Sequence, residues 1–142
     1  MERVSKGSLG YLDCLSTKDP YLYVEYKIDD QHRLGPIYWV DEDNRRGYML
    51  FGEAIAFDST YKTNKYNKPL VIIVSVNQHF ETCVFGLALI LDESEDAFFW
   101  LLRVFLYCMG NKKSKVVLTD GDDRIALAIR YFLPSSNHRI CA

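Results

Sequence analysis

The sequence predicts a mixed α/β domain in which one sheet combines antiparallel and parallel strands. Residues 54–91 contain three apolar strand-like runs separated by hairpin-sized polar segments. Residues 94–141 then alternate two amphipathic segments with two short apolar runs, the pattern of helices that connect parallel strands. The expected order of elements is β-β-β-α-β-α-β, which places helices on the faces of the sheet.

The composition indicates one globular, intracellular domain. The chain has 142 residues, of which 49% are hydrophobic and 14% aromatic, enough to bury a core. No apolar run approaches the roughly 20 residues that cross a bilayer, and the first residues lack the apolar core of a secretory signal. The four cysteines are scattered without a Cys-x-x-Cys pair, which favours reduced thiols. We therefore expect no membrane partner.

The net charge of the chain bears on whether it binds nucleic acid. The net charge is −2 and the sequence pI is about 5.9. This argues against a domain whose main role is to coat nucleic acid electrostatically. Any contact with DNA must then come from a local basic patch.

Residues 1–20 are predicted to form a helical lead-in. Leucines recur at helical spacing within residues 8–18. Asp19-Pro20 ends this helix, because the residue before a proline is disfavoured in the helical region. Residues 21–29 then alternate apolar and polar side chains, which is the period of a half-buried strand with Val24 and Tyr26 on its apolar face.

Residues 21–53 are predicted to form a hairpin and a helix that precede the core. The second strand falls at residues 34–40, where a Gly-Pro pair interrupts the ladder and suggests an edge strand or a bulge. A polar helix follows over residues 41–51, with acidic residues near its positive end and a glycine after its last residue.

The core is expected over residues 54–142. Asp92 and Glu95 have the spacing of a capping box at the start of its first helix. The apolar residues of that helix recur at three and four, so they belong in the core against the sheet. The predicted elements are strands 54–60, 70–76 and 82–91, helix 94–109, strand 115–119, helix 122–132 and strand 138–141.

Two aspartates stand out, because Asp58 and Asp120 each close an apolar strand-like run. In the predicted sheet the first and fourth core strands can lie side by side, so both carboxylates would meet at one end of the sheet. Two close carboxylates repel unless one is protonated or a cation lies between them, and carboxylate oxygens are ligands that Mg²⁺ accepts in phosphoryl-transfer sites. The alternative is that Asp58 starts a turn and Asp120 caps the next helix. Asp122 is a possible substitute ligand.

Two further groups of residues in the sequence are candidates for binding DNA or a metal ion. Lys62, Lys65 and Lys68 recur every three residues with tyrosines between them, a pattern that fits DNA phosphates and bases. The alternative is a solvated hairpin loop. His138 and Cys141 have the spacing of a pair of zinc ligands, but zinc takes four, so Cys141 is at most an incomplete zinc ligand.

Several blocks of the sequence resemble those of a known family. The block Phe57–Pro69 resembles the FDxTYxTNxYxxP block of Mutator-like transposases as kept in the plant far-red-impaired-response family. The resemblance runs in unbroken order from about Tyr21 to Cys141. Its further blocks are Tyr38–Asp41, Val76–His79, Phe85–Glu95, Phe99–Leu101, Met109–Gly110, Thr119–Asp122 and His138–Cys141.

The resemblance implies that residues 54–142 form a MULE transposase domain with a ribonuclease H-like fold. Asp58 and Asp120 would be the first two acids of its DDE triad. In the family the third acid follows a Cys-x-x-His element whose cysteine matches Cys141, so we expect this chain to be truncated, without the third acid or the last helix. Two acids do not clamp both the attacking and the leaving oxygen of a phosphodiester. We therefore expect no strand transfer by this chain.

The same resemblance implies a function. Members of this plant type are domesticated transposases that regulate transcription in the nucleus. They associate with DNA and bind zinc through domains outside this chain, and they form homo- or heterodimers with related members. Two other hypotheses stay open, a Mg²⁺-dependent transposase or nuclease fragment and a non-functional truncated domain.

Overall fold

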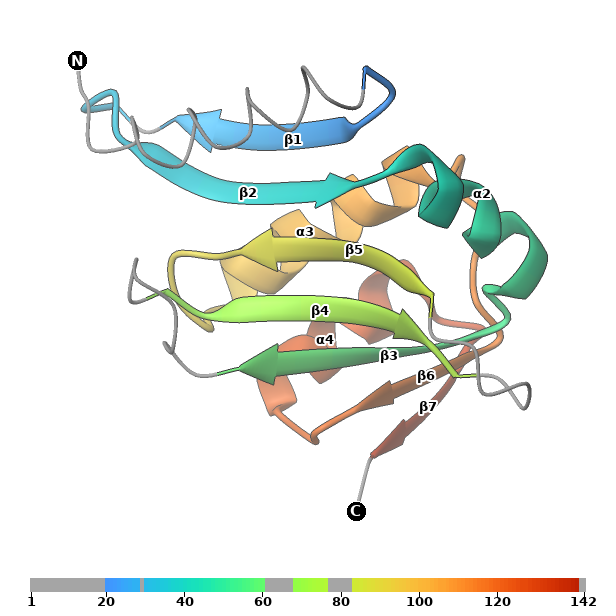
Figure 1. Cartoon of the computed structure of the whole chain (residues 1–142). Coiled ribbons are helices and arrows are strands. Elements are labelled where there is room, and N and C mark those ends of the chain that lie inside the picture. The colour runs from blue at the N-terminus through green and yellow to red at the C-terminus, as the bar shows by residue number, and fades with distance from the viewer. Residues whose placement is uncertain (1–19, 29, 61–67, 77–82, 141–142) are drawn as a thin grey trace.

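The computed structural model describes residues 20–28, 30–60, 68–76 and 83–140. It consists of one seven-stranded sheet and three helices within these residues (Figure 1). In chain order the elements are β1 (Tyr23–Ile28), β2 (Leu34–Val40), α2 (Glu42–Phe51), β3 (Ala54–Thr60), β4 (Leu70–Ser75), β5 (Val84–Leu89), α3 (Glu95–Cys108), β6 (Val116–Thr119), α4 (Asp123–Phe132) and β7 (Asn137–Ile140).

The sheet has the mixed topology that the sequence predicts. Its strand order is β1-β2-β5-β4-β3-β6-β7. The ladders joining β3, β4 and β5 are antiparallel, and those joining β3 to β6 and β6 to β7 are parallel. The hairpin of β1 and β2 continues the same sheet through an antiparallel ladder between β2 and β5. This architecture is of the ribonuclease H-like type.

Helices α3 and α4 lie on one face of the sheet (Figure 1). Aromatic side chains fill the space between them and the strands, and Phe105 of α3 is at their centre. Its ring meets those of Tyr48, Tyr38 and Phe57 edge to face, with centroid distances of 5.2, 6.3 and 6.2 Å. Such aromatic pairs stabilise a core beyond the area they bury. The predicted core role of this helix is confirmed.

A buried polar network fixes the start of β6. The Tyr48 hydroxyl donates to the Lys112 carbonyl at 2.7 Å and lies 3.0 Å from the Ser114 hydroxyl. Ser114 in turn donates to the Gly52 carbonyl at 2.5 Å. These bonds satisfy hydroxyls that would otherwise be costly to bury. They tie the end of α2 to the segment that enters β6.

The structure confirms some of the local predictions and corrects others. Ser94, not Asp92, is the N-cap of α3, because its hydroxyl accepts from the Ala97 amide. The Asp92 carboxylate accepts from the Ser94 amide instead. The Gly-Pro pair of β2 lies at an irregularity in the β1 ladder, so the predicted bulge is present, but β2 is an interior strand. The predicted helix at residues 8–18 lies outside the described residues.

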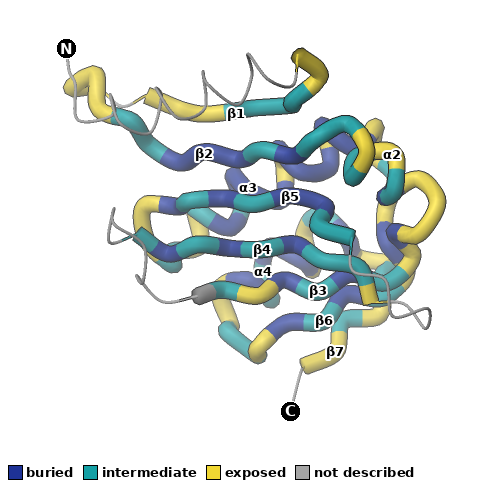
Figure 2. Tube along the Cα trace, viewed as in Figure 1, coloured by how far each residue is buried: buried dark blue, intermediate teal, exposed yellow. Residues whose placement is uncertain are grey.

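β1 turns the opposite way from the sequence prediction. Tyr23 packs against the core, with its ring centroid 6.2 Å from that of Tyr38. Tyr26 and Ile28 are each 46% exposed. β1 is an edge strand (Figure 2), and Arg45 covers the Tyr23 ring at 5.1 Å. That cation–π contact stabilises a face that alternation alone assigns to solvent.

The described part of the chain contains no helix that is long and apolar enough to cross a membrane.

We expect Gly86→Ala to destabilise the fold by about 3 kcal/mol, because overpacking and backbone strain add. Gly86 has a φ of +153°, and a Cβ there would lie 2.2 Å from Cε1 of the buried Tyr38 ring. The ring cannot retreat easily, since its hydroxyl donates to the Phe85 carbonyl at 2.7 Å. Urea unfolding followed by circular dichroism measures the loss.

Gly110→Ala is the matched control, with a φ of +65° and no atom within 4 Å of the added Cβ. It should cost about 1 kcal/mol from backbone strain alone. Equal losses in the two variants would show that the Tyr38 contact does not constrain the fold.

Candidate functional site

Asp58 and Asp120 lie at the same edge of the sheet. The parallel ladder of β3 and β6 pairs Ala56 with Leu118. Asp58 lies two residues after Ala56, and Asp120 lies two residues after Leu118. If the register of the ladder continues, the two aspartates lie opposite one another. Both are exposed. The predicted juxtaposition of the two strands is therefore present in the structure.

The two carboxylates point away from the helices. Phe57, which precedes Asp58 on β3, is buried against Phe105 of α3. Side chains alternate between the faces of a strand, so Asp58 projects from the opposite face. That face carries the half-buried apolar residues Ile72 and Leu118, and none of the described helices covers it.

The alternative roles proposed for the two aspartates are only partly realised. Asp58 does not start a turn, since it pairs with Ile72 within the β3 and β4 ladder. Asp120 is not the cap of α4, whose N-cap is Asp122. The Asp120 carboxylate accepts from the Asp122 amide at 3.1 Å, so it orders the turn that leads into the helix.

Asp122 is already occupied by an arginine. Arg124 donates to its carboxylate from Nε at 2.9 Å and from Nη2 at 2.6 Å. The Arg124 amide also donates to the same group at 2.8 Å. These hydrogen bonds hold the pKa of Asp122 below its ordinary value. With both oxygens engaged, Asp122 is a poor substitute for a third metal ligand.

Acidic residues crowd this edge, because the strands that lead into α3 and α4 end there. Glu93 accepts a hydrogen bond from Ser59 of β3 at 3.4 Å. We call this edge the acidic rim, and it comprises Asp58, Asp92, Glu93, Glu95, Asp96, Asp120, Asp122 and Asp123. Hydrogen bonds from Ser94 lower the pKa of Asp92, and the charges of Lys68 and Arg124 lower it further. Like charges that share one edge favour a cationic counterpart.

The rim does not assemble a complete metal site from the residues that the structure describes. No three His, Cys, Asp or Glu side chains gather there in an arrangement that holds a metal ion. Asp58 and Asp120 supply the oxygen chemistry that Mg²⁺ accepts, but two exposed carboxylates bind it weakly. The donor set does not fit two-metal phosphoryl transfer, which needs both ions clamped.

Lys68 is half-buried and lies near Asp92, at the rim. Lys62 and Lys65 lie outside the described residues. A contact between these three lysines and DNA stays a prediction, and the Asp92 carboxylate near Lys68 repels phosphate.

Thr119 and His138 form a contact that sequence reasoning missed. The buried Thr119 hydroxyl lies 2.8 Å from Nε2 of His138 on β7. It also accepts from the Gly121 amide at 3.3 Å. His138 thus joins β7 to the end of β6 beside Asp120. Cys141, its predicted partner in a zinc pair, lies outside the described residues.

Comparison with known proteins identifies the class. The chain matches the family model described as the MULE transposase domain over residues 54–142, and it belongs to that family. Its relatives narrow the type. It is 32% identical to Protein FAR-RED IMPAIRED RESPONSE 1 and 32% identical to Protein FAR1-RELATED SEQUENCE 4, both from Arabidopsis thaliana. The chain is of the transposase-derived, far-red-impaired-response type.

The alignments to these two relatives cover 92% and 94% of this chain, but only 16% and 18% of the relatives. Protein FAR1-RELATED SEQUENCE 5 is 30% identical with similar coverage, 94% of this chain and 17% of the relative. The functions of the full-length relatives are therefore assigned to this chain only as proposals.

We expect the stability contributed by His138 to fall as the pH falls. Burial lowers the pKa of His138 below its ordinary value, and Arg130 lowers it further. The unfolded chain therefore binds the proton first, so this contribution is fully present above about pH 6.5 and is lost as the pH falls towards the lower folded pKa.

Urea unfolding at pH 7.5 and pH 5.5 tests this against His138→Gln, which keeps a hydrogen-bonding side chain but does not titrate. The stability of the natural chain should fall relative to that of the variant at the lower pH. A constant difference between the two proteins would contradict the burial of a neutral imidazole at this position.

Proposed function

We propose that this chain is the core of a domesticated transposase that regulates transcription in the nucleus, and that Asp58 and Asp120 are relics of its DDE site. The observation that carries the proposal is the acid pair itself. It stands at the edge where the parallel strands β3 and β6 end, yet among the described residues no third acid joins the pair in an arrangement that could hold a metal ion. A scaffold that keeps the geometry without the full ligand set fits a regulator better than an enzyme.

The occupancy of Asp122 supports this proposal. This carboxylate lies beside the acid pair and accepts two hydrogen bonds from the Arg124 side chain, so it serves the turn and the helix rather than a metal ion. Its lowered pKa reflects the arginine. Freeing it for a metal would break charge-assisted hydrogen bonds, which are stronger than neutral ones.

The charge of the acidic rim also bears on DNA association. Phosphates are repelled by a cluster of carboxylates unless cations intervene. The rim is therefore a poor DNA surface by itself. In the proposed regulator, DNA is held by other parts of a longer polypeptide or by a dimer partner, and zinc belongs to those parts.

The relative named for an impaired far-red response adds support from its name alone. That name describes a response to light rather than the movement of DNA. It favours a regulatory role for a chain that shares 32% of its residues with that relative over 130 positions.

We expect the chain to nick no DNA. Purified protein incubated with supercoiled plasmid and either Mg²⁺ or Mn²⁺ should give the same background as its Asp58→Asn variant, because two exposed acids do not clamp both reacting oxygens. Gel electrophoresis of the plasmid measures nicking. Metal-dependent nicking that disappears in the variant would instead establish the nuclease reading.

Transcriptional function is tested at the gene. An epitope tag at the natural locus should place the product in the nuclear fraction and on chromatin, and transcript profiles should change when the locus is deleted. Asp58→Asn together with Asp120→Asn should leave those profiles unchanged, since the proposal gives the pair no catalytic role. A product outside the nucleus, or a deletion without any effect on transcripts, would refute the regulator proposal.

A further inference from the structure

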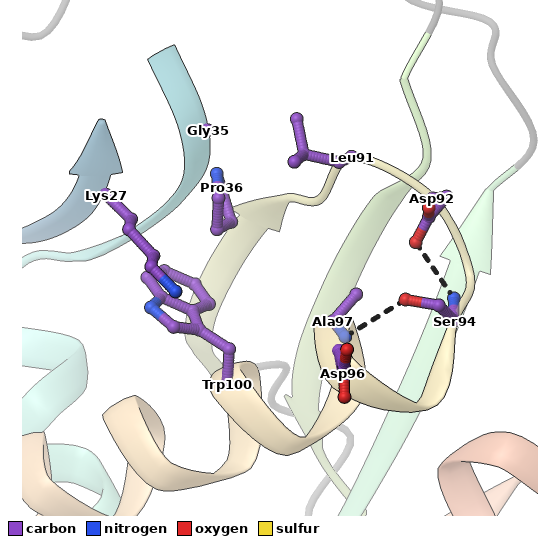
Figure 3. Close-up of a pocket in the computed structure, with 9 residues that line it drawn as sticks. All are labelled: Lys27, Gly35, Pro36, Leu91, Asp92, Ser94, Asp96, Ala97 and Trp100. Atoms are coloured by element: carbon purple, nitrogen blue, oxygen red, sulfur yellow. Dashed lines mark hydrogen bonds between the residues drawn. The ribbon is translucent and has the colours of Figure 1, made fainter. Parts of the chain in front are cut away.

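A cavity of about 330 Å³ opens between the β1 and β2 hairpin and the start of α3. Figure 3 shows its residues arriving from three directions. Lys27 and Pro36 come from the hairpin, Leu91 comes from the segment after β5, and Asp96 and Trp100 come from the first turns of α3. We call it the hairpin pocket.

The pocket exists because the sheet splits at this point. The ladder of β2 and β5 ends where Ile37 pairs with Leu89. The ladder of β1 and β2 continues beyond it to the pair of Ile28 and Leu34. The hairpin therefore diverges from the chain after β5, and the space between them stays open.

Gly35 is required at the split. A Cβ there would lie 2.8 Å from the Lys27 carbonyl oxygen, which is backbone and cannot rotate away. The next residue, Pro36, has no amide hydrogen to leave unpaired as the strands separate. The sequence of the hairpin thus suits an opening rather than a continuous ladder.

The wall of the pocket is largely apolar. Trp100 lines it and is 8% exposed, so most of the indole is packed and its position is fixed. Pro36, Leu91 and Ala97 provide the other apolar surface. A flat aromatic group held in an apolar recess binds either another flat group or a cation.

Three charged side chains line the same pocket, namely Asp92, Asp96 and Lys27. The Asp92 carboxylate accepts from the Ser94 amide at 3.1 Å, as drawn in Figure 3. Among the described residues, the side chains of Asp96 and Lys27 have no hydrogen bond or ion pair, either with each other or with a neighbour. Asp96 is therefore available to a ligand, and the described part of the lining carries one more negative than positive charge.

We propose that the hairpin pocket receives an arginine side chain from a basic segment of a partner protein. The planar guanidinium can stack on an indole and donate two parallel hydrogen bonds to a carboxylate. Trp100 and Asp96 offer these two surfaces in one cavity. The methylene stem of the arginine would pack on Pro36 and Leu91, as long cationic side chains do along apolar surface.

Charge complementarity favours this occupant over an anionic one. Lys27 is the sole cation among the lining residues that the structure describes, and it stands on a flexible four-carbon stem that can swing into solvent. Glu93 and Glu95 flank the lining residues in the sequence and extend the negative field of the acidic rim. The site is independent of the acid pair Asp58 and Asp120, so it stands whether or not the regulator proposal holds.

The test is a titration of the isotopically labelled 142-residue chain with the peptide acetyl-Gly-Arg-Gly-amide, followed by NMR. We expect shifts at the Trp100 indole N–H and at the Ala97 amide. The same peptide with citrulline in place of arginine keeps the shape and loses the charge, and it should bind on the order of tenfold more weakly because the charge-assisted bonds are lost.

Two neighbouring acids provide a matched pair of variants. Asp96 and Glu95 are both exposed and both lie in the first turn of α3, so each contributes similarly to that helix. Asp96 lines the pocket and Glu95 does not. Asp96→Asn should weaken arginine binding on the order of tenfold, and Glu95→Gln should change it less than about twofold. Lys27→Gln should strengthen binding, since it removes the competing cation.

Four results would overturn the proposal. Shifts that avoid the Trp100 indole would place the peptide elsewhere. Equal binding of the arginine and citrulline peptides, or equal effects of Asp96→Asn and Glu95→Gln, would remove the role of the carboxylate. Weaker binding by Lys27→Gln, together with shifts at Trp100 on adding inorganic phosphate, would make the pocket an anion site.

Discussion

The site depends on one backbone interaction, the parallel pairing of β3 with β6. The Glu53 carbonyl accepts from the amides of Lys115 and Val116 at 2.8 and 2.9 Å, just before the ladder begins. The bonds of Tyr48 and Ser114 hold the same region from the other side. With the register set there, the two strands run side by side and deliver their aspartates to one edge. A slip of one residue would turn one carboxylate into the core.

The core elements could be predicted from the sequence because their patterns are local and strong. The apolar run of β3, the three-and-four spacing in α3 and the glycine after α2 each predict one element independently of the others. The orientation of β1 could not, since the partly buried Tyr23 ring lies against Arg45, a residue of α2 that no strand pattern reveals. The acid pair was visible as two strand ends, but the capture of Asp122 by Arg124 needed the geometry of a turn.

The hairpin pocket could not be predicted from the sequence either. Trp100 reads in the sequence as one more core aromatic of α3, and its 8% exposure agrees. Its role in a cavity appears only when the hairpin and the segment after β5 separate around it. A split between two strands leaves no periodic signal, and the Gly-Pro pair in β2 indicates an irregularity without saying what it makes room for.

The negative charge of the acidic rim affects both the acid pair and the hairpin pocket. The exposed carboxylates add little to the packing of an aromatic core, so the fold can persist without a catalytic use for them. Their mutual repulsion remains, and folding concentrates them at one edge by ending β3, β5 and β6 there. Arg124 and Lys68 offset part of that charge, through hydrogen bonds to Asp122 and through proximity to Asp92. A basic partner segment would offset more, so the charge that makes this edge a poor surface for DNA makes it a suitable one for an arginine-bearing protein.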